Sequence, residues 1–241
     1  MLKFKTSRFR AAVAAGVLGA GLALATPGSA IAETVLKLVP QADLKNLDPI
    51  WTTASITNNH GYMVYDTLFA LDSKLEPKPQ MVESFSVSDD KLTYTFTLRE
   101  GLLFHDGSPV ESTDVIASIK RWAQKRSDGM AMMDRAKSLE AKDARTFVLT
   151  LTEPFGPAIQ VMANPTLPLF IMREEEAKTD PNKQVAEVIG SGPFVFAKDE
   201  WVPGDKVVYR KFDKYKPRNE PSDGFAGGKV VKVDKVEWIY I

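Results

Sequence analysis

His105 and Asp106 come nearest to an acid–base pair, because an imidazole and a carboxylate can move protons near neutral pH. Neighbours in a chain rarely face one another, however, and no serine or cysteine nucleophile context accompanies them. They lie in a segment that reads FHDGSP, where aspartate–glycine favours a tight turn and proline stiffens its exit. We therefore interpret them as part of a structural turn that leads into a capped helix. The alternative is a secreted hydrolase that uses Asp106 or Asp114, which would need a second carboxylate or a base brought close by folding.

Two further patterns invite chemical interpretations that the sequence does not support. Residues 190–192 read GSG, but they lack the lysine and the wider glycine spacing of a phosphate-binding loop, so a turn that needs permissive φ angles is predicted instead. His60 is one of two histidines, and the chain has no cysteine. These counts exclude disulfides, zinc–thiolate sites and a cysteine nucleophile, and they argue against a metal site. We predict no metal, no cofactor and no enzymatic activity.

The charge of the chain is balanced overall but not along its length. The 241 residues contain 31 basic and 31 acidic side chains, and four of the basic ones lie in the first ten residues. Without these four, the chain carries 27 basic against 31 acidic residues. A mildly acidic body argues against nucleic acid as a partner, because such proteins present a basic patch.

The first 32 residues have the pattern of a secretory signal peptide. A basic stretch precedes residues 11–25, which are all small or apolar, and residues 30–32 read AIA. Fifteen apolar residues are short for a membrane anchor, the alternative, which needs about 20. The arginines at 8 and 10 are not a twin pair, which favours Sec export, and no cysteine is present for lipoprotein acylation. We predict cleavage after Ala32 and a periplasmic protein that starts at Glu33.

The elements that must position the polar residues are read from periodicity. Leu92, Tyr94, Phe96 and Leu98 alternate with threonines, as in a half-buried strand, and Val115 begins an apolar helix face capped by Ser112 or Thr113. We expect strands over residues 35–39, 92–98, 145–152, 194–196, 206–212 and 229–241, and helices over 56–70 and from about 112. Strands and helices mix without regular alternation, which predicts an α/β (mixed α+β) fold.

The chain stops inside an apolar segment, VEWIYI at residues 236–241. Domain ends are usually polar and exposed, so this feature favours a chain that continues in the intact protein. The alternative is a terminal strand buried in the middle of a sheet.

Several motifs, taken together, carry a resemblance to a known family. The segment 104–115, FHDGSPVESTDV, resembles the hallmark of the family 5 extracellular solute-binding proteins, the periplasmic receptors of peptide/nickel-type ABC importers. The family's other motifs follow in its order, with Ser191 where threonine is common. They are NLDP at 46–49, YDTL at 65–68, LEP at 75–77, MVESF at 81–85, TFTLREG at 95–101 and GSGPF at 190–194.

The resemblance implies a type II, periplasmic-binding-protein-like architecture. Such proteins have two lobes that close on a cleft, and residues 33–241 resemble the first lobe, a mixed β-sheet flanked by helices, truncated before the second. It implies a monomer that captures a small solute or peptide and delivers it to an ABC permease in the inner membrane. Peptides are the first candidate, while nickel chelates, opines, glutathione and sugars remain open. A rival is a non-transport, chaperone-like interaction lobe.

Ligands bind beyond strand ends, so we expect the loop after the first strand to line the cleft. Trp51 could equally be core, Asp43 could cap a turn, and Met130 could pack between lobes. The family similarity adds the proline-broken stretch near residue 165. The predicted ligand-binding residues are Gln41, Asp43, Trp51, Thr52, Thr53, Asn58, Met130, Asn164 and Thr166. Because one wall of the cleft is missing, we expect the lobe alone to bind ligand weakly or not at all.

Overall fold

The computed structural model describes Met1 and residues 32–241. The predicted signal peptide and its apolar stretch fall mainly on residues 2–31, which lie outside the described part. The chain divides into two units, Met1–Ala32 and Glu33–Ile241, and the second unit contains all the helices and strands of the described residues.

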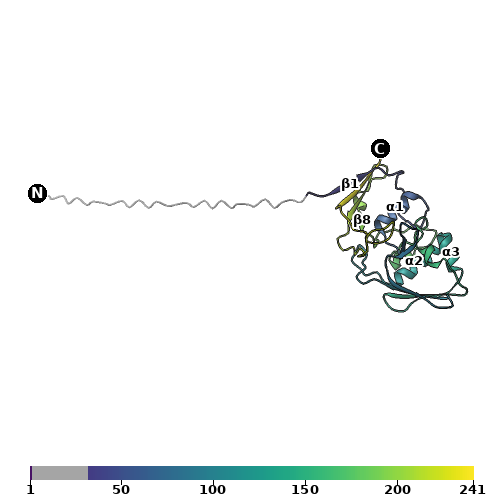
Figure 1. The fold of residues 1–241 in the computed structure, drawn as a ribbon. Helices are drawn as coiled ribbons and strands as arrows, with labels where there is room; N and C mark the ends of the chain where they lie inside the picture. Colours follow the sequence, from purple (N-terminus) through teal and green to yellow (C-terminus); the bar gives the residue numbers. More distant parts are fainter. Residues whose placement is uncertain (2–31) are drawn as a thin grey trace. The chain divides into compact units, whose positions relative to one another are not determined.

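The first sheet brings the two ends of this unit together. It contains β1 (Val35–Leu38), β10 (Lys235–Ile239), β9 (Lys206–Lys211) and β8 (Phe194–Phe196), in that order across the sheet. β1 runs parallel to β10, whereas β10, β9 and β8 are antiparallel. Figure 1 shows β1 and β8 near the C-terminus, with α1 (Ser55–Val64) beside them. The strands predicted at 35–39, 194–196 and 206–212 are confirmed to within one residue, while the predicted 229–241 shortens to β10.

The second sheet is antiparallel, with the order β4 (Val82–Val87), β5 (Thr93–Leu98), β7 (Thr146–Leu151) and β6 (Ala136–Ala141). β5 and β7 alternate buried and half-buried residues, as their sequence period predicts. Phe96 and Phe147 stack across them with ring centroids 4.8 Å apart. Helix α2 (Ser112–Lys125) contacts β6 and β7. A hairpin of β2 (Phe69–Leu71) and β3 (Pro77–Pro79) forms a two-stranded sheet of its own. The mixed α/β class is confirmed, but the described residues form two four-stranded sheets and this hairpin in place of the single sheet expected.

Two helix predictions need correction. α1 ends at Val64 rather than at residue 70, because the chain turns extended at Tyr65 and continues into β2. The cap of α2 is Glu111, not Ser112 or Thr113: the Glu111 side chain accepts from the third helical N–H, and the Asp114 carboxylate accepts from the Glu111 N–H (2.8 Å). The short helices are α3 (Ser127–Met133), α4 (Ala158–Met162) and α5 (Glu174–Ala177). Among the residues described, no helix has the length and apolarity needed to cross a membrane.

A buried ion pair ties the loop after β1 to α2. Asp48 and Arg121 are 1% and 2% exposed, and the Arg121 Nη2 lies 2.5 Å from the Asp48 Oδ2. The same carboxylate accepts hydrogen bonds from the main chain of Ile50 and Val185. Because each charge is buried against the other, the pair fixes where the loop leaves the core.

Candidate functional site

His105 clamps the hallmark turn against the segment 190–192. Its main-chain N–H donates to the Gly190 carbonyl (2.9 Å), and the Gly190 N–H lies 3.3 Å from the ring Nδ1. The Nδ1 is therefore an acceptor, and the Nε2 carries the proton that it donates to the Gly192 carbonyl (3.1 Å). Burial lowers the pKa of His105 to about 4, although the bond to Gly192 opposes this. A neutral imidazole with a hydrogen bond at each ring nitrogen holds the two segments together and has a structural role.

Asp106 and Asp114 serve turns rather than chemistry. Asp106 accepts bonds from the N–H and hydroxyl of Ser108 (2.9 and 2.6 Å) and from Arg173 (2.8 Å). Burial raises the pKa of Asp106, but these bonds outweigh it and lower the pKa overall. Asp114 accepts from the main chain of Glu111 and Glu174, and burial, its largest influence, raises its pKa. Each carboxylate is thus satisfied by its own turn or helix cap and by one partner near residue 173, which favours the structural interpretation over a hydrolase.

The glycines at 190 and 192 are needed for close packing rather than for permissive φ angles, which corrects our expectation. Neither has a positive φ. A Cβ at Gly190 would lie 1.9 Å from the Val64 carbonyl oxygen, and one at Gly192 would lie 2.7 Å from the Val64 carbonyl carbon. The segment passes directly against the end of α1, where no side chain fits.

His60 is a core residue. It is fully buried on α1, its Nδ1 lies 2.9 Å from the Tyr209 hydroxyl, and its ring meets Phe196 edge-on at 5.3 Å. Burial lowers the pKa of His60 to about 3, against a main-chain bond to Leu47 that raises it. It is held neutral inside the protein, between α1 and the first sheet.

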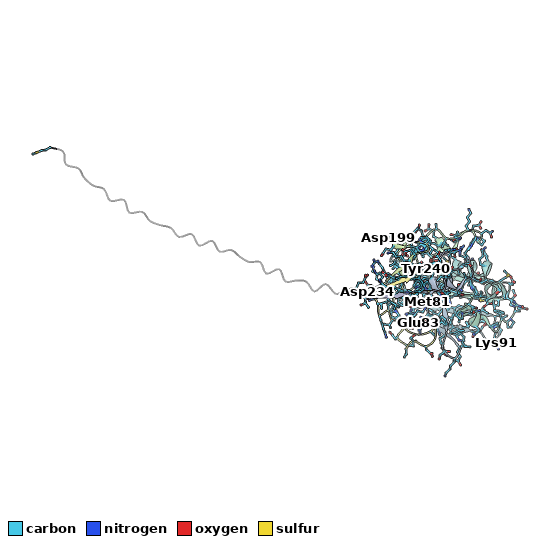
Figure 2. All side chains as sticks on the ribbon, turned by 90° about the horizontal axis from the view of Figure 1, so that it is seen from above. Met81, Glu83, Lys91, Asp199, Asp234 and Tyr240 are labelled. Carbon is cyan, nitrogen blue, oxygen red and sulfur yellow. The ribbon has the colours of Figure 1, made fainter. Side chains whose placement is uncertain are left out.

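The loop after β1 and the end of β10 meet at one end of the first sheet, because parallel neighbours finish on the same side. The Leu44 N–H donates to the Tyr240 hydroxyl (2.9 Å), which joins them directly (Tyr240 is labelled in Figure 2). Asp43 accepts from the Gly204 N–H (3.2 Å), as a turn-capping aspartate does. Gln41 is exposed in the same loop. The structure therefore places this loop next to the last residues of the chain.

Trp51 and Thr52 lie at the junction of α2 and α3. The Lys125 ammonium stands 4.7 Å above the Trp51 ring, and both side chains are half-exposed. Arg126, 1% exposed, donates from its Nη2 to the carbonyls of Pro49 (2.7 Å) and Thr52 (2.6 Å). This buried guanidinium holds the loop in place, so that the Trp51 ring and its cation stay at the surface.

A second group of predicted residues is joined by hydrogen bonds. The Asn58 Nδ2 donates to the Thr166 carbonyl (3.2 Å), and the Asn164 Oδ1 accepts from the N–H and hydroxyl of Thr166 (3.0 and 2.9 Å). Asn164 also donates to Asp128 on α3 (2.7 Å), the helix that carries Met130. Asn58 is 8% exposed and its Oδ1 has no hydrogen-bond partner.

The nine predicted residues thus form two neighbouring groups rather than a closed pocket. Asn58, Asn164 and Thr166 make direct contacts, and α3 links them to Met130 and, through Arg126, to Thr52. Gln41, Thr53, Met130 and Thr166 are exposed, so this is an open wall. Met132, by contrast, is buried core.

Sequence reasoning missed two aromatic residues beside this wall. The Tyr62 ring lies 5.4 Å from that of Phe225, and its hydroxyl is 3.4 Å from the Pro165 carbonyl. Phe225 is 49% exposed, although it is a large apolar residue. The sequence signal for Phe225 was a large aromatic residue between glycines at 224 and 227, because such loops often carry binding residues.

The family model described as bacterial extracellular solute-binding proteins, family 5 Middle, matches residues 76–241. The chain belongs to family 5 of the bacterial extracellular solute-binding proteins. The family 5 resemblance inferred from the motifs is confirmed. The structure adds a physical reason for two of them, because FHDG and GSGPF touch through His105.

Curated relatives extend the match toward the N-terminus. Over 229 residues, 92% of this chain, it is 50% identical to "Probable peptide ABC transporter periplasmic-binding protein y4tO" of Sinorhizobium fredii (strain NBRC 101917 / NGR234). Over 234 residues, 95% of the chain, it is 28% identical to the glutathione-binding protein GsiB of Escherichia coli (strain K12). The matched spans are 42% and 43% of these relatives, so this chain covers less than half of their length.

Solved structures support the same fold. The binding protein AgaA of A. tumefaciens R10, in complex with agropinic acid, matches 86% of this chain and 40% of its own, with a TM-score of 0.70 and 25% identity. DppA from Helicobacter pylori, in complex with the peptide STSA, matches 87% of this chain and 43% of its own, with a TM-score of 0.67 and 26% identity. The type II family 5 architecture, represented by part of its length, is therefore confirmed.

Proposed function

We propose that this chain is the first lobe of a periplasmic receptor that captures a peptide for an ABC importer. The observation that carries the proposal is the open wall of polar and aromatic side chains that the loop after β1 forms with α3, in a chain 50% identical to a relative named for peptide transport. Glutathione, in the name of a second relative, is itself a small peptide. Capture of such a ligand is binding, not catalysis.

The chemistry of the wall suits an extended backbone. A peptide offers alternating N–H and C=O groups, which amide and hydroxyl side chains can read whatever the ligand's sequence. Gln41 and Thr53 supply exposed polar groups, and Asn58, which is buried, supports the exposed Thr166 through its bond to the Thr166 carbonyl. The Trp51 ring adds a flat apolar surface on which a ligand side chain can pack.

Transport requires the second wall. A ligand held between two lobes favours the closed form by its difference in affinity for the closed and open states. The closed monomer would then be recognised by a permease in the inner membrane, after export and removal of residues 1–32. Because this wall is open, the chain by itself supplies only part of the surface that would enclose a ligand in a closed receptor.

Calorimetry with two proteins tests the proposal. The first is this chain, and the second is a chimera in which it replaces the matched span of the S. fredii relative. Trialanine, glutathione and a disaccharide serve as probes. We expect the chimera to bind a peptide probe, and the chain alone to bind none at ~1 µM affinity. In the chimera, Trp51→Ala should weaken peptide binding about tenfold, while Phe85→Ala, at a half-exposed aromatic on the other sheet, should not.

Either of two results contradicts the proposal. A chimera that binds the disaccharide and neither peptide probe would reject the peptide class. Micromolar binding of a peptide by the chain alone would show that its wall is a complete site, and the role as one lobe of a two-lobed receptor would fall.

A further inference from the structure

A polar hollow lies where the turn after β5 meets the segment 216–220. It has a volume of about 450 Å³. Four cations line it, namely Arg99, Arg145, Lys216 and Arg218, together with three glutamates, so that one positive charge is in excess. None of the nine predicted ligand-binding residues contributes to this lining. The hollow is therefore separate from the open wall, and the proposed function does not use it.

Arg99 brings a nearly buried positive charge to the hollow. The residue is 7% exposed, and its guanidinium donates to three main-chain carbonyls, those of Gln80 (2.9 Å), Lys216 (3.0 Å) and Pro217 (3.4 Å). Within the described part of the chain, it forms no salt bridge with a carboxylate. Buried charges are normally paired, so this guanidinium leaves a positive potential in the hollow that an anion would neutralise.

Lys216 adds a second cation, and this one has free donors. Its ammonium donates to the Glu100 carbonyl (2.7 Å), and among the residues described it too forms no salt bridge. An ammonium has three N–H groups, so two remain available to a ligand. Because Arg99 bonds to the Lys216 carbonyl, the backbone that carries this lysine is fixed at the hollow.

Two of the three glutamates are engaged by the other two cations. Glu220 lies 2.8 Å from Arg218, and Glu100 lies 3.2 Å from Arg145. The Arg145 and Glu100 side chains are 45% and 76% exposed, and exposed pairs of this kind are weak, so the Arg145 guanidinium is available to a stronger acceptor. Glu83, the third glutamate, is exposed on β4 and is labelled in Figure 2.

We propose that this hollow, which we name the Arg99 hollow (Arg99, Arg145, Lys216 and Asn219), binds the phosphate group of a small soluble phosphomonoester. The fork of Arg145 and the ammonium of Lys216 donate to its oxygens, and Asn219 adds an amide. A phosphomonoester carries between one and two negative charges near pH 7, so it gains more from the Arg99 charge than a single carboxylate does.

The size of the hollow also favours more than a bare ion. Its volume lies in the range of small-molecule sites, which leaves room for the organic group that carries the phosphate. A lipid headgroup presents the same phosphate oxygens, and the experiment separates that source from a soluble one. The inference does not depend on the peptide role, so its failure would leave the proposed function untouched.

Nuclear magnetic resonance titration of the ¹⁵N-labelled chain tests the assignment, with glycerol 3-phosphate as the probe and glycerol as its uncharged match. We expect glycerol 3-phosphate to shift the amides of residues 99–101, 145 and 216–220 saturably at millimolar concentration, and glycerol to shift none of them. Lys216→Gln and Arg145→Gln should each weaken this binding about fivefold or more. Lys137→Gln, at an exposed lysine on β6, removes the same charge outside the hollow and should change the affinity less than about twofold.

Three results would overturn the proposal: no saturable shift, shifts confined to other residues, or variants at 145 and 216 that bind as tightly as the Lys137 control. Vesicles that contain phosphatidylglycerol form the last arm. If they bind the chain through Lys216 while glycerol 3-phosphate does not, the phosphate belongs to a lipid and the soluble ligand is rejected. Circular dichroism shows whether each variant folds, and both substituted side chains are exposed.

Discussion

Lowering the pH from 7 to 5 is expected to destabilise this protein chiefly through its two histidines. Burial lowers the pKa of His60 to about 3 and that of His105 to about 4, whereas both rings titrate near 6.5 in the unfolded chain. Between these values the unfolded chain binds protons that the folded chain does not, so stability falls as the pH drops through the window from 6.5 toward 3 or 4. The linkage relation gives a loss of about 2 kcal/mol for each histidine between pH 7 and pH 5, or about 4 kcal/mol for both.

Urea unfolding of the purified chain at pH 5, 6 and 7 measures this loss. His60→Gln removes one titrating ring, so the change in unfolding free energy between pH 7 and pH 5 should shrink by about 2 kcal/mol, whatever the variant's stability at pH 7. Asn59→Gln, at the exposed neighbour of His60 on α1, should keep the full change. If His60→Gln and the unsubstituted chain lose the same stability to within about 0.5 kcal/mol, His60 is not held neutral by burial and the reasoning is refuted.

Three further predictions concern packing, charge and processing. Gly190→Ala should lower the unfolding free energy, measured by heat or urea, by about 3 kcal/mol or more, because the new Cβ would lie 1.9 Å from the backbone of α1. Gly156→Ala, with open space around it, should change that free energy by less than about 0.5 kcal/mol. Equal losses for the two variants would contradict the packing argument. Arg121→Met should cost about 3–5 kcal/mol by leaving the buried Asp48 carboxylate unpaired, and adding Asp48→Asn should recover part of that loss; no recovery would mean that charge is not the cause. Mass spectrometry of the periplasmic protein should find Glu33 at the mature N-terminus, and retention of Met1 would reject the predicted cleavage.

Much of the fold could be predicted because its signals are local. The alternation in β5 and β7 and the apolar face of α2 each lie within one element, so the sequence alone reveals them. The ends of the elements, by contrast, depend on contacts with distant residues. The chain leaves α1 at Tyr65, and the next residue, Asp66, is 1% exposed and contacts Tyr215 and Lys229 (2.8 and 2.7 Å), which lie 149 and 163 residues away in sequence. A local pattern carries no information on such partners.

The sequence likewise predicted some features of the candidate site, and the fold decided the others. Motif order determined the family, and residue type together with position after the first strand selected Trp51, in the loop, and Asn58, which the structure places on α1. The pairing of β1 with β10, which brings the loop after β1 to Tyr240, joins residues about 200 apart, and only the folded chain shows it. The role of Gly190 likewise depends on α1, which passes beside it. The exposure of Leu36 depends on its position on the edge strand β1, which only the folded chain shows. By itself the sequence determined the most periodic elements and the family, because periodicity and motifs act over a few residues. The tertiary structure alone decided which surfaces meet, because those contacts are made by the packing of the whole chain.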